Sequence, residues 1–461
     1  MLVQLVLGFL IFLSIGACDS RDAGPLYAAW RVEIVDPASG VVHVHGEIPV
    51  MVGTTTLALQ FRDLKRHPQA LLALTARSGG RELVVDHITE DADATHRIDV
   101  TGIVDPVVIE YTINPTFFPP GGSEKYPSDA RSRVVDGVGV VRTGSLLPTM
   151  TDGNRNARVS FSLPADWVAV TPWRSVDTGV FTIPASEWGQ VDYLGLGPFE
   201  TLELPVGKDI VRIGVLGVDS EIDVDAVAGL LEFHRELAGS PPVDPGPRTV
   251  LLVPQKFMRG GAAGARSTVQ IADAGVLAHE LLHWWVHSDL TTAEAKWFTE
   301  GFTNYYGILA AQEVGLLSQD EVTECFADLN AEMRYLERDR PRSLQQVSEG
   351  YTREARSRRL VYSKGTLFAE LLERELRLQD RALSEFMRAV LTESRAGLNN
   401  KDLRETLANV YGNLADARFI ANVIAGEALP DMGFGPATGR SGCARYLPEH
   451  GDQPFERERE P

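Results

Sequence analysis

The sequence predicts a multidomain protein with an N-terminal all-β domain, a central α+β domain and a C-terminal helical segment. In the first half, short runs of β-branched and aromatic residues alternate with Gly, Pro, Asp and Asn, which is the pattern of strands joined by turns. In the second half, a strand–helix–strand order precedes long amphipathic segments, which is typical of a mixed sheet packed against helices. The 461 residues are enough for two or three hydrophobic cores.

The first residues indicate export from the cytoplasm. An apolar stretch without charge, Leu2 to Ile15, is followed by small residues and Cys18. This order resembles a bacterial lipoprotein signal, which implies removal of a signal peptide over residues 1–17, lipidation of Cys18 and a polar linker over residues 18–25. Because no lysine or arginine precedes the stretch, an ordinary secretory signal or an N-terminal anchor is the alternative; a membrane-spanning helix needs about 20 residues. We therefore expect a cell-envelope protein, membrane-anchored through a lipid or secreted.

Residues 26–205 are predicted to form the all-β domain. His43 and His45 fall on one face of a strand, but two histidines without a carboxylate are more typical of a solvated edge than of a metal site. The clearest strands are expected at residues 30–35, 41–48, 54–61, 107–113, 159–163 and 180–183.

Residues 206–378 are predicted to form the α+β domain, and residues 379–434 a helical region followed by a tail over 435–461. The strand at 267–273 is expected at the edge of the sheet. The other strands are expected at 210–217 and 249–254, and the helices at 223–238, 319–338, 360–377, 383–392 and 401–411.

The strongest chemical signal is the motif His279-Glu280-Leu281-Leu282-His283. On a helix, this spacing puts two imidazoles one turn apart with a carboxylate beside them, which is the arrangement of a zinc site that carries its own general base. Apolar residues around the motif predict a largely buried helix that continues to Val286. A dry environment favours neutral imidazole ligands. The alternative is a pair of hydrogen-bonded histidines in a core helix.

A zinc ion held by two histidines needs a third protein ligand and an open position for water. His287 would lie about 12 Å along the helix axis from His279, which is too far for one ion. Glu294 falls in a polar loop. Glu300 is the preferred candidate because the aromatic stretch around it, Trp297 to Tyr306, predicts a second buried helix, where a carboxylate is costly unless paired or metal-bound.

Two further residues are expected beside this site. Asn304, one turn after Glu300, faces the same way and is expected to hydrogen-bond the second nitrogen of a ligand histidine. Tyr362 opens an amphipathic segment. Taken alone, it is as consistent with core packing and a solvated hydroxyl as with catalysis.

Three ordered motifs together resemble the gluzincin metallopeptidases, most closely the glycyl aminopeptidase family and next the alanyl/leucyl aminopeptidases. They are His-Glu-x-x-His, Trp-Phe-Thr-Glu-Gly-Phe-Thr-Asn-Tyr-Tyr and Tyr-Ser-Lys-Gly, which starts at Tyr362. The resemblance implies a thermolysin-like α+β catalytic domain with His279, His283 and Glu300 as zinc ligands. It also implies that Glu280 polarises the attacking water and that Tyr362 stabilises the tetrahedral oxyanion. The segment between the second histidine and Glu300 is slightly short for these families, which implies a shortened loop.

The segment before the zinc motif resembles the substrate-binding strand of the same families, with one difference. Gly260, Gly261, Ser267 and Thr268 match positions for which the resemblance implies substrate binding. Ala263 stands where the relatives carry the glutamate that binds the free amino group of the substrate. This difference leaves open whether the protein is an endopeptidase or an aminopeptidase that binds the amine through another acid, such as one in the β domain. In either case we expect the substrate backbone to add to the sheet as an extra strand.

Charge and cysteine content limit the partners. The formal net charge of −19 argues against nucleic acid or anionic membranes bound through basic patches. A local arginine cluster from Arg353 to Arg359 is more typical of a solvated turn than of a carboxylate-binding patch. If Cys18 is lipidated, Cys325 and Cys443 are left as a pair that an oxidising compartment can join.

The sequence thus predicts a zinc-dependent peptidase of the cell envelope that hydrolyses peptide or protein substrates with metal-activated water. The alternative is a zinc-binding scaffold or binding lipoprotein that has lost turnover, which the absent amino-group glutamate keeps open. Glu280 and Tyr362 are needed for chemistry and not for holding a metal, so their joint presence favours the enzyme.

Overall fold

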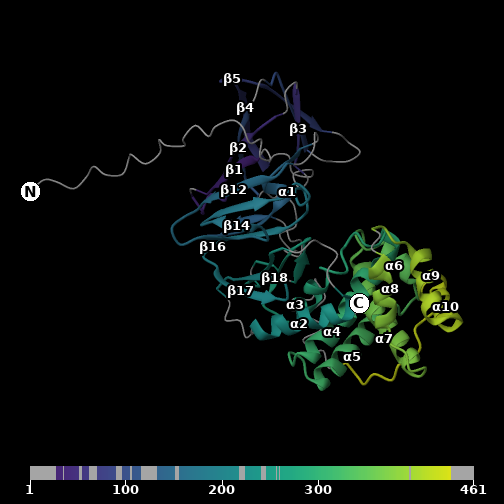
Figure 1. Ribbon diagram of the computed structural model, residues 1–461. Helices are drawn as coiled ribbons and strands as arrows, with labels where there is room; N and C mark the ends of the chain where they lie inside the picture. The colour runs from purple at the N-terminus through teal and green to yellow at the C-terminus, as the bar shows by residue number, and fades with distance from the viewer. Residues whose placement is uncertain are drawn as a thin grey trace, which may run out of the picture.

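A β-rich N-terminal half and a helical C-terminal half meet at a five-stranded sheet in the computed structural model (Figure 1). Its order of a β region followed by a helical region agrees with the prediction. The signal, the linker, Cys18, Cys443 and most of the tail lie outside the part of the chain that is described. The described residues are 27–34, 36–50, 54–61, 70–89, 96–103, 106–115, 132–135, 137–150, 155–217, 224–239, 246–255, 257–258, 260–393 and 396–437.

The largest sheet of the N-terminal region has the order β14-β15-β12-β1-β2-β8-β4-β5. Trp30 on β1 fills its core, where it stacks on Trp188 with ring centroids 6.1 Å apart and meets Tyr111 edge-on. The predicted strands of this region are found within a few residues of their expected bounds. The sheet contains β1 (Ala28–Glu33), β2 (Val42–Ile48), β4 (Leu71–Ser78), β5 (Arg81–Glu82), β8 (Val107–Ile113), β12 (Ala157–Ser162), β14 (Arg174–Asp177) and β15 (Val180–Ile183).

Two four-stranded sheets complete the N-terminal region, with a short helix, α1 (Thr143–Leu146), after β10. The first has the order β11-β3-β7-β6 and contains β3 (Thr56–Phe61), β6 (Val84–Thr89), β7 (His96–Thr101) and β11 (Thr149–Met150). The second has the order β13-β16-β10-β9 and contains β9 (Arg133–Val135), β10 (Val138–Arg142), β13 (Val168–Val170) and β16 (Tyr193–Gly197).

The five-stranded sheet is mixed and has the order β17-β18-β19-β21-β20. The three middle strands run parallel, and a hairpin adds an antiparallel strand at each edge. Because β17 belongs to this sheet, the α+β domain begins near residue 200 and not at residue 206. The strand predicted at the edge, β21, is covered by β20, whose three Gly and Ala residues show no alternating pattern. The strands are β17 (Glu200–Val206), β18 (Asp209–Val215), β19 (Arg248–Val253), β20 (Gly261–Ala263) and β21 (Ser267–Ile271).

Buried polar contacts join β16 to the five-stranded sheet. Ser267 Oγ accepts a hydrogen bond from Tyr193 N at 2.6 Å and donates to Asp192 Oδ1 at 3.0 Å. The same Asp192 oxygen accepts from Arg266 N at 2.7 Å, and Arg266 forms an ion pair with Glu187 at 2.7 Å. Burial raises the pKa of Asp192 to about 6 in spite of these hydrogen bonds. The contacts fix β21 against the N-terminal region.

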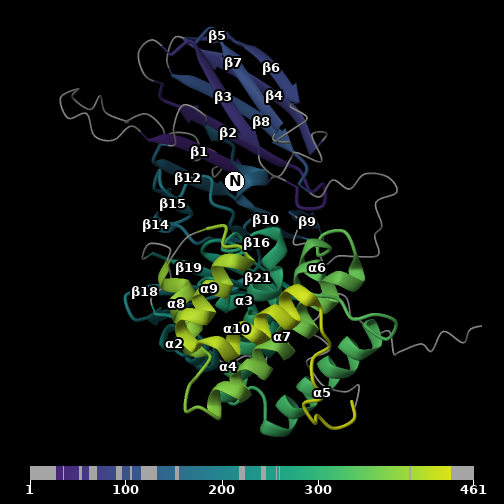
Figure 2. The ribbon, with the colours of Figure 1, turned by 90° about the vertical axis from the view of Figure 1, so that its right-hand side faces the viewer.

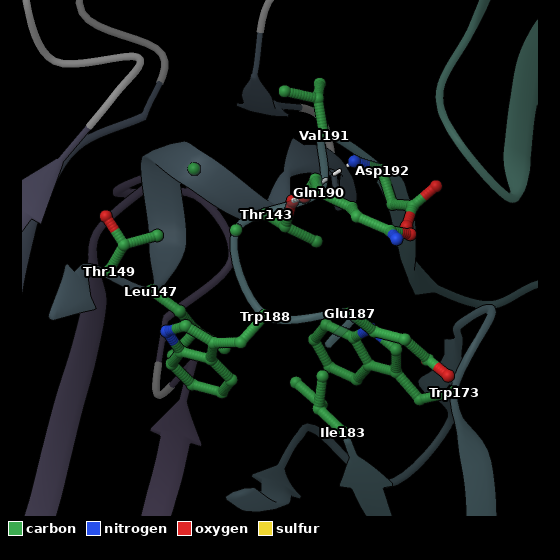
Figure 3. A pocket seen from close by; sticks show the side chains of 12 residues that line it. Thr143, Leu147, Thr149, Trp173, Ile183, Glu187, Trp188, Gln190, Val191 and Asp192 are labelled. Atoms are coloured by element: carbon green, nitrogen blue, oxygen red, sulfur yellow. Dashed lines mark hydrogen bonds between the residues drawn. The ribbon is translucent and has the colours of Figure 1, made fainter. Parts of the chain in front are cut away.

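A small cavity lies at this junction (Figure 3). Its volume is about 20 Å³, and Thr143, Trp173, Glu187, Trp188 and Asp192 are among its lining residues. A space of this size holds about one water molecule, so the cavity is a gap in the packing and not a peptide-binding site.

Helices pack against one face of the five-stranded sheet and form the C-terminal part (Figure 2). The predicted helices are all present, although α7 begins five residues before its expected start at residue 360. The helices are α2 (Val224–Ala238), α3 (Ala274–Leu282), η3 (Ala293–Ala295), η4 (Trp297–Phe302), α4 (Thr303–Glu313), α5 (Gln319–Leu336), α6 (Leu344–Glu349), α7 (Ala355–Arg377), α8 (Ser384–Glu393), α9 (Asn400–Tyr411), α10 (Asn413–Phe419) and η5 (Ile420–Ala425).

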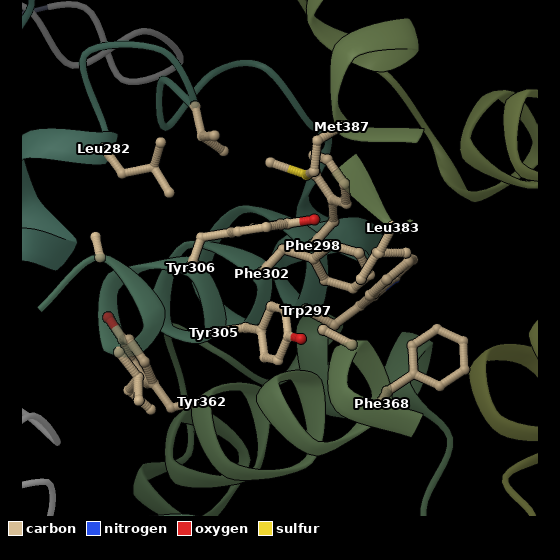
Figure 4. Close-up of a cluster of buried hydrophobic side chains, with 14 of the residues drawn as sticks. Leu282, Trp297, Phe298, Phe302, Tyr305, Tyr306, Tyr362, Phe368, Leu383 and Met387 are labelled. Carbon is tan, nitrogen blue, oxygen red and sulfur yellow. The ribbon is translucent and has the colours of Figure 1, made fainter. Parts of the chain in front are cut away.

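Aromatic side chains dominate the core of the helical part (Figure 4). Trp297 is fully buried and meets Phe298, Phe302 and Phe368 edge-on, with ring centroids 5.6 to 5.9 Å apart. Burial of each such side chain contributes about 1.5–3 kcal/mol. The packing holds η4 against α7.

The end of the described chain runs back along α5 and α7. Phe434 stacks on Phe326 with ring centroids 5.6 Å apart, and Arg374 lies over Phe434 while it donates to the carbonyl of Met432 at 2.7 Å. Cys325 on α5 is fully buried and disulfide-bonded, and both other cysteines lie outside the described residues. None of the described helices is long and apolar enough to cross a membrane.

Candidate metal centre

Helix α3 carries the His-Glu-x-x-His motif. It begins after Asp273, whose Oδ1 caps the helix by accepting hydrogen bonds from Gly275 N at 3.2 Å and Val276 N at 3.3 Å. The helix is buried along nearly its whole length and ends just before His283. The expected continuation of the helix beyond the motif is wrong, because the apolar residues after His283 are buried in a turn.

His279 and His283 direct their Nε2 atoms at one point. The two Nε2 atoms are 3.0 Å apart, and the ring planes cross at 81°. Nδ1 of His283 donates to the carbonyl of Val286 at 2.9 Å, so the neutral ring carries its lone pair on Nε2. Burial lowers the pKa of His279. Both rings are thus held as the motif predicts, with their Nε2 atoms facing each other.

Glu300 completes a cluster of three buried residues that could hold a metal ion. Its Oε2 lies 3.7 Å from Nε2 of His279 and 3.7 Å from Nε2 of His283. Burial would raise the pKa of Glu300, but hydrogen bonds and attraction from both histidines hold that pKa well below its usual range. Among the residues that the structure describes, this is the group whose ligand atoms gather closely enough to hold a metal ion.

Glycines allow the helices to approach closely enough to place Glu300. A Cβ on Gly301 of η4 would lie 2.5 Å from Cα of Gly365 on α7, so this crossing has no room for a side chain. A Cβ on Gly307 of α4 would lie 3.1 Å from the backbone nitrogen of His279. The π-helical turn η4, a form frequent at functional sites, carries Glu300 itself.

Tyr362 reaches the same cluster from α7. Its hydroxyl donates to Glu300 Oε2 at 2.8 Å, and its ring centroid lies 5.8 Å from that of His279. The hydroxyl also lies 3.2 Å from that of Tyr351. Burial, with the negative charge of Glu300, raises the pKa of Tyr362 well above its usual value, so this phenol keeps its proton and stays a donor.

Glu280 lies on α3 beside the three ligand residues and contacts the edge of the sheet. A Cβ on Gly261 would lie 2.4 Å from Cγ of Glu280 and 2.6 Å from its Oε1. Burial raises the pKa of Glu280 to about 8, with His283 opposing the shift and Glu300 adding to it. The positive charge of a zinc ion in the neighbouring cluster would lower this pKa and favour the ionised carboxylate, which is the form that acts as a general base.

Three residues considered for the site have other partners. Asn304 Nδ2 donates to Thr366 Oγ1 at 2.9 Å, which differs from the expected hydrogen bond to a ligand histidine. His287 interacts with Asp289 at 2.6 Å. Glu294 Oε1 accepts from the first backbone N–H of α9 at 2.9 Å. Neither rival of Glu300 therefore belongs to the cluster.

The predicted substrate-binding residues separate into two groups. Gly260 and Gly261 lie at the start of the edge strand β20, where Gly261 contacts Glu280. Ser267 and Thr268 are fully buried on β21. Their side chains are therefore removed from any surface that a substrate reaches, and the hydroxyl of Ser267 serves the junction with β16 instead.

The arginine cluster at the start of α7 is engaged by neighbouring elements. Arg359 pairs with Glu332 at 2.7 Å, and Arg356 donates to the carbonyl of Leu336. Arg353 donates to a carbonyl in the last turn of α6 at 2.8 Å. These contacts tie α7 to α5 and α6, which supports a structural role for the cluster.

The three ligand residues fit a zinc ion. Two imidazole nitrogens and one carboxylate oxygen are a common ligand set of catalytic zinc. Ligands of a tetrahedral zinc site lie about 3.3–3.4 Å apart, and the distances here are 3.0 and 3.7 Å. Two imidazole nitrogens this close need a positive charge between them, which a proton or a metal ion supplies. The pKa of His283 also indicates that this cluster favours a positive charge. Burial lowers that pKa, but Glu300 and Glu280 raise it to about 9.

Comparisons with known proteins agree with this geometry. Residues 250–424 match the peptidase family M1 domain. This part of the chain is a peptidase family M1 domain. It contains His279, Glu280, His283, Glu300 and Tyr362. The protein is a zinc metallopeptidase, and zinc is its cofactor.

Solved structures share the fold of the M1 domain and of the β region before it. An aminopeptidase N family protein from Idiomarina loihiensis has a TM-score of 0.70 at 17% identity, over 87% of this chain and 77% of that one. An M1 zinc metallopeptidase from Deinococcus radiodurans has a TM-score of 0.57 at 17% identity, over 89% and 96%. Yeast LTA4 hydrolase has a TM-score of 0.51 at 14% identity, over 89% and 69%. A search of curated proteins finds no match.

Proposed function

We propose that the protein is an envelope zinc peptidase that hydrolyses peptide bonds without the usual requirement for a free amino terminus. The observation that carries the proposal is the joint placement of Glu280 and Tyr362 around the three ligand residues, with Ala263 near the same sheet edge. A general base, an oxyanion donor and a metal ligand set are the parts that peptide hydrolysis needs.

Each of these side chains has a distinct task in the proposed reaction. His279, His283 and Glu300 would hold zinc, which supplies Lewis-acid activation of water. Glu280, in its ionised form, takes the proton of that water and passes it to the leaving amine. Tyr362 donates its phenolic hydrogen to the oxyanion that develops on the scissile carbonyl, because its high pKa keeps the hydrogen in place.

The edge strand β20 offers a place for the substrate backbone. It pairs with β21 on one side and is the last strand of its sheet among the described residues. An extended peptide that pairs with its other side would run past Glu280, which contacts Gly261. Sequence-independent backbone pairing of this kind fits a peptidase with broad side-chain tolerance.

Ala263 decides the amino-group selectivity in this proposal. It has no charge to pair with an ammonium group, whereas the resembling families carry a glutamate at this point. We expect the wild-type protein to cleave N-acetylated and free-amine forms of one peptide with similar kcat/KM. Ala263→Glu should raise the preference for the free amine by about tenfold or more, since a charge-assisted hydrogen bond contributes about 1.5–3 kcal/mol. A strong free-amine preference in the wild type would contradict the proposal.

A catalytically silent scaffold is the second candidate function, and the absent glutamate is the feature that favours it. The two candidates differ in one measurement, which is cleavage of a mixed peptide library by the zinc-loaded protein. Cleavage of neither free nor blocked peptides, with zinc bound, would support the scaffold. Cleavage at internal bonds supports the peptidase.

The cellular location and the subfamily are also part of the proposal. The apolar N-terminus that ends at Cys18 supports a lipid-anchored envelope protein, and the Gly260-Gly261 and Ser267-Thr268 pairs support the glycyl aminopeptidase likeness. Expression in a bacterial host with labelled palmitate tests the anchor. Label should enter the wild type and be absent from Cys18→Ala, and equal labelling of both would contradict lipidation of this cysteine.

A further inference from the structure

Tyr351 is a second tyrosine at the metal centre, and it belongs to none of the sequence motifs. It lies in the turn between α6 and α7, with its hydroxyl 3.2 Å from that of Tyr362 and the ring centroids 6.3 Å apart. The burial of the Tyr351 hydroxyl raises its pKa above the usual value, and the charges of Glu300 and Glu280 add to the shift. The hydroxyl is therefore turned toward the site.

The chemistry of the acceptor fixes the direction of the hydrogen bonds. An ionised carboxylate only accepts, so the hydroxyl hydrogen of Tyr362 points to Glu300 Oε2 at 2.8 Å. The oxygen of Tyr362 is then left to accept from Tyr351. The result is an ordered chain in which Tyr351 donates to Tyr362 and Tyr362 donates to the metal centre.

We propose that Tyr351 is a positioning residue that aims the hydroxyl hydrogen of Tyr362 at the metal centre. Its donated hydrogen bond restricts rotation about the C–O bond of Tyr362. It also polarises the Tyr362 hydroxyl and makes it a stronger donor, because hydrogen bonds in a chain reinforce one another. The inference rests on the proposed function of Tyr362 as the oxyanion donor.

The ring of Tyr351 has supports that do not involve its hydroxyl. Its backbone N–H donates to the carbonyl of Ser348 at 3.0 Å, and its carbonyl accepts from Nε of Arg358 at 3.4 Å. The guanidinium of Arg358 also lies over the ring, 5.9 Å from its centroid. Tyr351→Phe therefore removes the hydroxyl and leaves the ring held in place.

A double-mutant cycle tests the proposal. Tyr351→Phe should lower kcat about fivefold, which is the value of one ordinary hydrogen bond, with KM and zinc content unchanged. The affinity for a phosphinic peptide, which mimics the tetrahedral oxyanion, should fall by the same factor in calorimetry. In the Tyr362→Phe background, Tyr351→Phe should change neither quantity, because its effect acts through the Tyr362 hydroxyl.

Tyr411→Phe is the matched control. This variant also loses a hydroxyl with hydrogen-bond partners. The Tyr411 hydroxyl accepts from Phe386 N at 3.1 Å and donates to the carbonyl of Ala382, and neither partner belongs to the zinc-site cluster. This variant should lose thermal stability and keep the wild-type kcat and phosphinic affinity.

Two results would overturn the proposal. One is an unchanged phosphinic affinity and kcat in Tyr351→Phe, and the other is an equal loss in the presence and absence of the Tyr362 hydroxyl. If the wild type cleaves no peptide at all, the proposed function fails. The phosphinic affinities of the four proteins in the cycle still decide the role of Tyr351.

Discussion

Gly261→Ala tests whether catalysis depends on the position of Glu280. The added Cβ would lie 2.4 Å from Cγ of Glu280, 2.7 Å from Cδ and 2.6 Å from Oε1. Non-bonded carbon atoms pack at about 3.5–4.0 Å, so the carboxylate has to move by about 1 Å or more. The backbone of Gly261 has no positive φ that would itself exclude alanine.

The expected effect of Gly261→Ala is on rate more than on stability. Misplacement of a reacting group by about 1 Å costs about 100-fold, so kcat/KM should fall by about that factor. The free energy of unfolding should fall by no more than about 1–3 kcal/mol, because the displaced group is a side chain and not backbone. Zinc content should stay at the wild-type level, since the three atoms nearest to the new methyl group all belong to Glu280.

The assay combines kcat/KM on a fluorogenic peptide, zinc per chain and the melting temperature. Gly435→Ala is the control, because nothing lies within 4 Å of its added Cβ. In a Glu280→Gln background, Gly261→Ala should cost little further activity. Wild-type kcat/KM in Gly261→Ala would refute the argument from Glu280 placement.

Three further outcomes follow from the same structure. His283→Ala should weaken zinc binding by more than about 100-fold, because loss of a residue that only hydrogen-bonds a metal ligand already costs up to about that factor. Full zinc occupancy at limiting zinc would exclude His283 as a ligand. The pKa of Asp192 is about 6 in the folded protein, above the ordinary 3.8, so its contribution to the free energy of unfolding is present below pH 3.8 and is lost as pH rises through 6. The free energy of unfolding of Asp192→Asn, relative to wild type, should therefore rise by up to about 3 kcal/mol between pH 4 and pH 8 in denaturant titrations. A pH-independent difference would contradict this. Non-reducing peptide mapping should find Cys325 joined to Cys443, and reduction should cost about 2–4 kcal/mol of stability; a free thiol at Cys325 would contradict the disulfide.

Most of the fold could be predicted because its elements carry local signals. Helix α5, for example, follows Ser318, whose side chain and Glu321 form a capping box that the sequence spells out three residues apart. The strands of the β region alternate buried and exposed residues, as in β2 and β8. Such elements need no knowledge of their neighbours.

Predictions from local sequence pattern are wrong where tertiary packing overrides that pattern. The apolar run after His283 has the composition of a buried helix, but the core buries it equally well in a turn. The strand that begins at Ser267 was predicted at the edge of the sheet because β20 was not recognised. Three small residues, Gly261 to Ala263, form that strand only because β21 supplies their partners.

The cluster of His279, His283 and Glu300 could be predicted, whereas the residues that position it could not. His279, His283 and Glu300 are recognisable because metal chemistry restricts both residue type and spacing. Tyr351 carries no such signal, since its contact with Tyr362 depends on how the turn before α7 folds. The crossing of Gly301 and Gly365 likewise becomes visible only once η4 and α7 are in contact.

Glu280→Gln, assayed for zinc content and peptidase activity on one preparation, separates metal binding from chemistry. Glutamine keeps the shape of the side chain but accepts no proton, and it leaves His279, His283 and Glu300 intact. We predict wild-type zinc content with peptide hydrolysis lower by about 10²- to 10⁴-fold. Wild-type activity in this variant would contradict the assignment of Glu280 as the general base of a zinc peptidase.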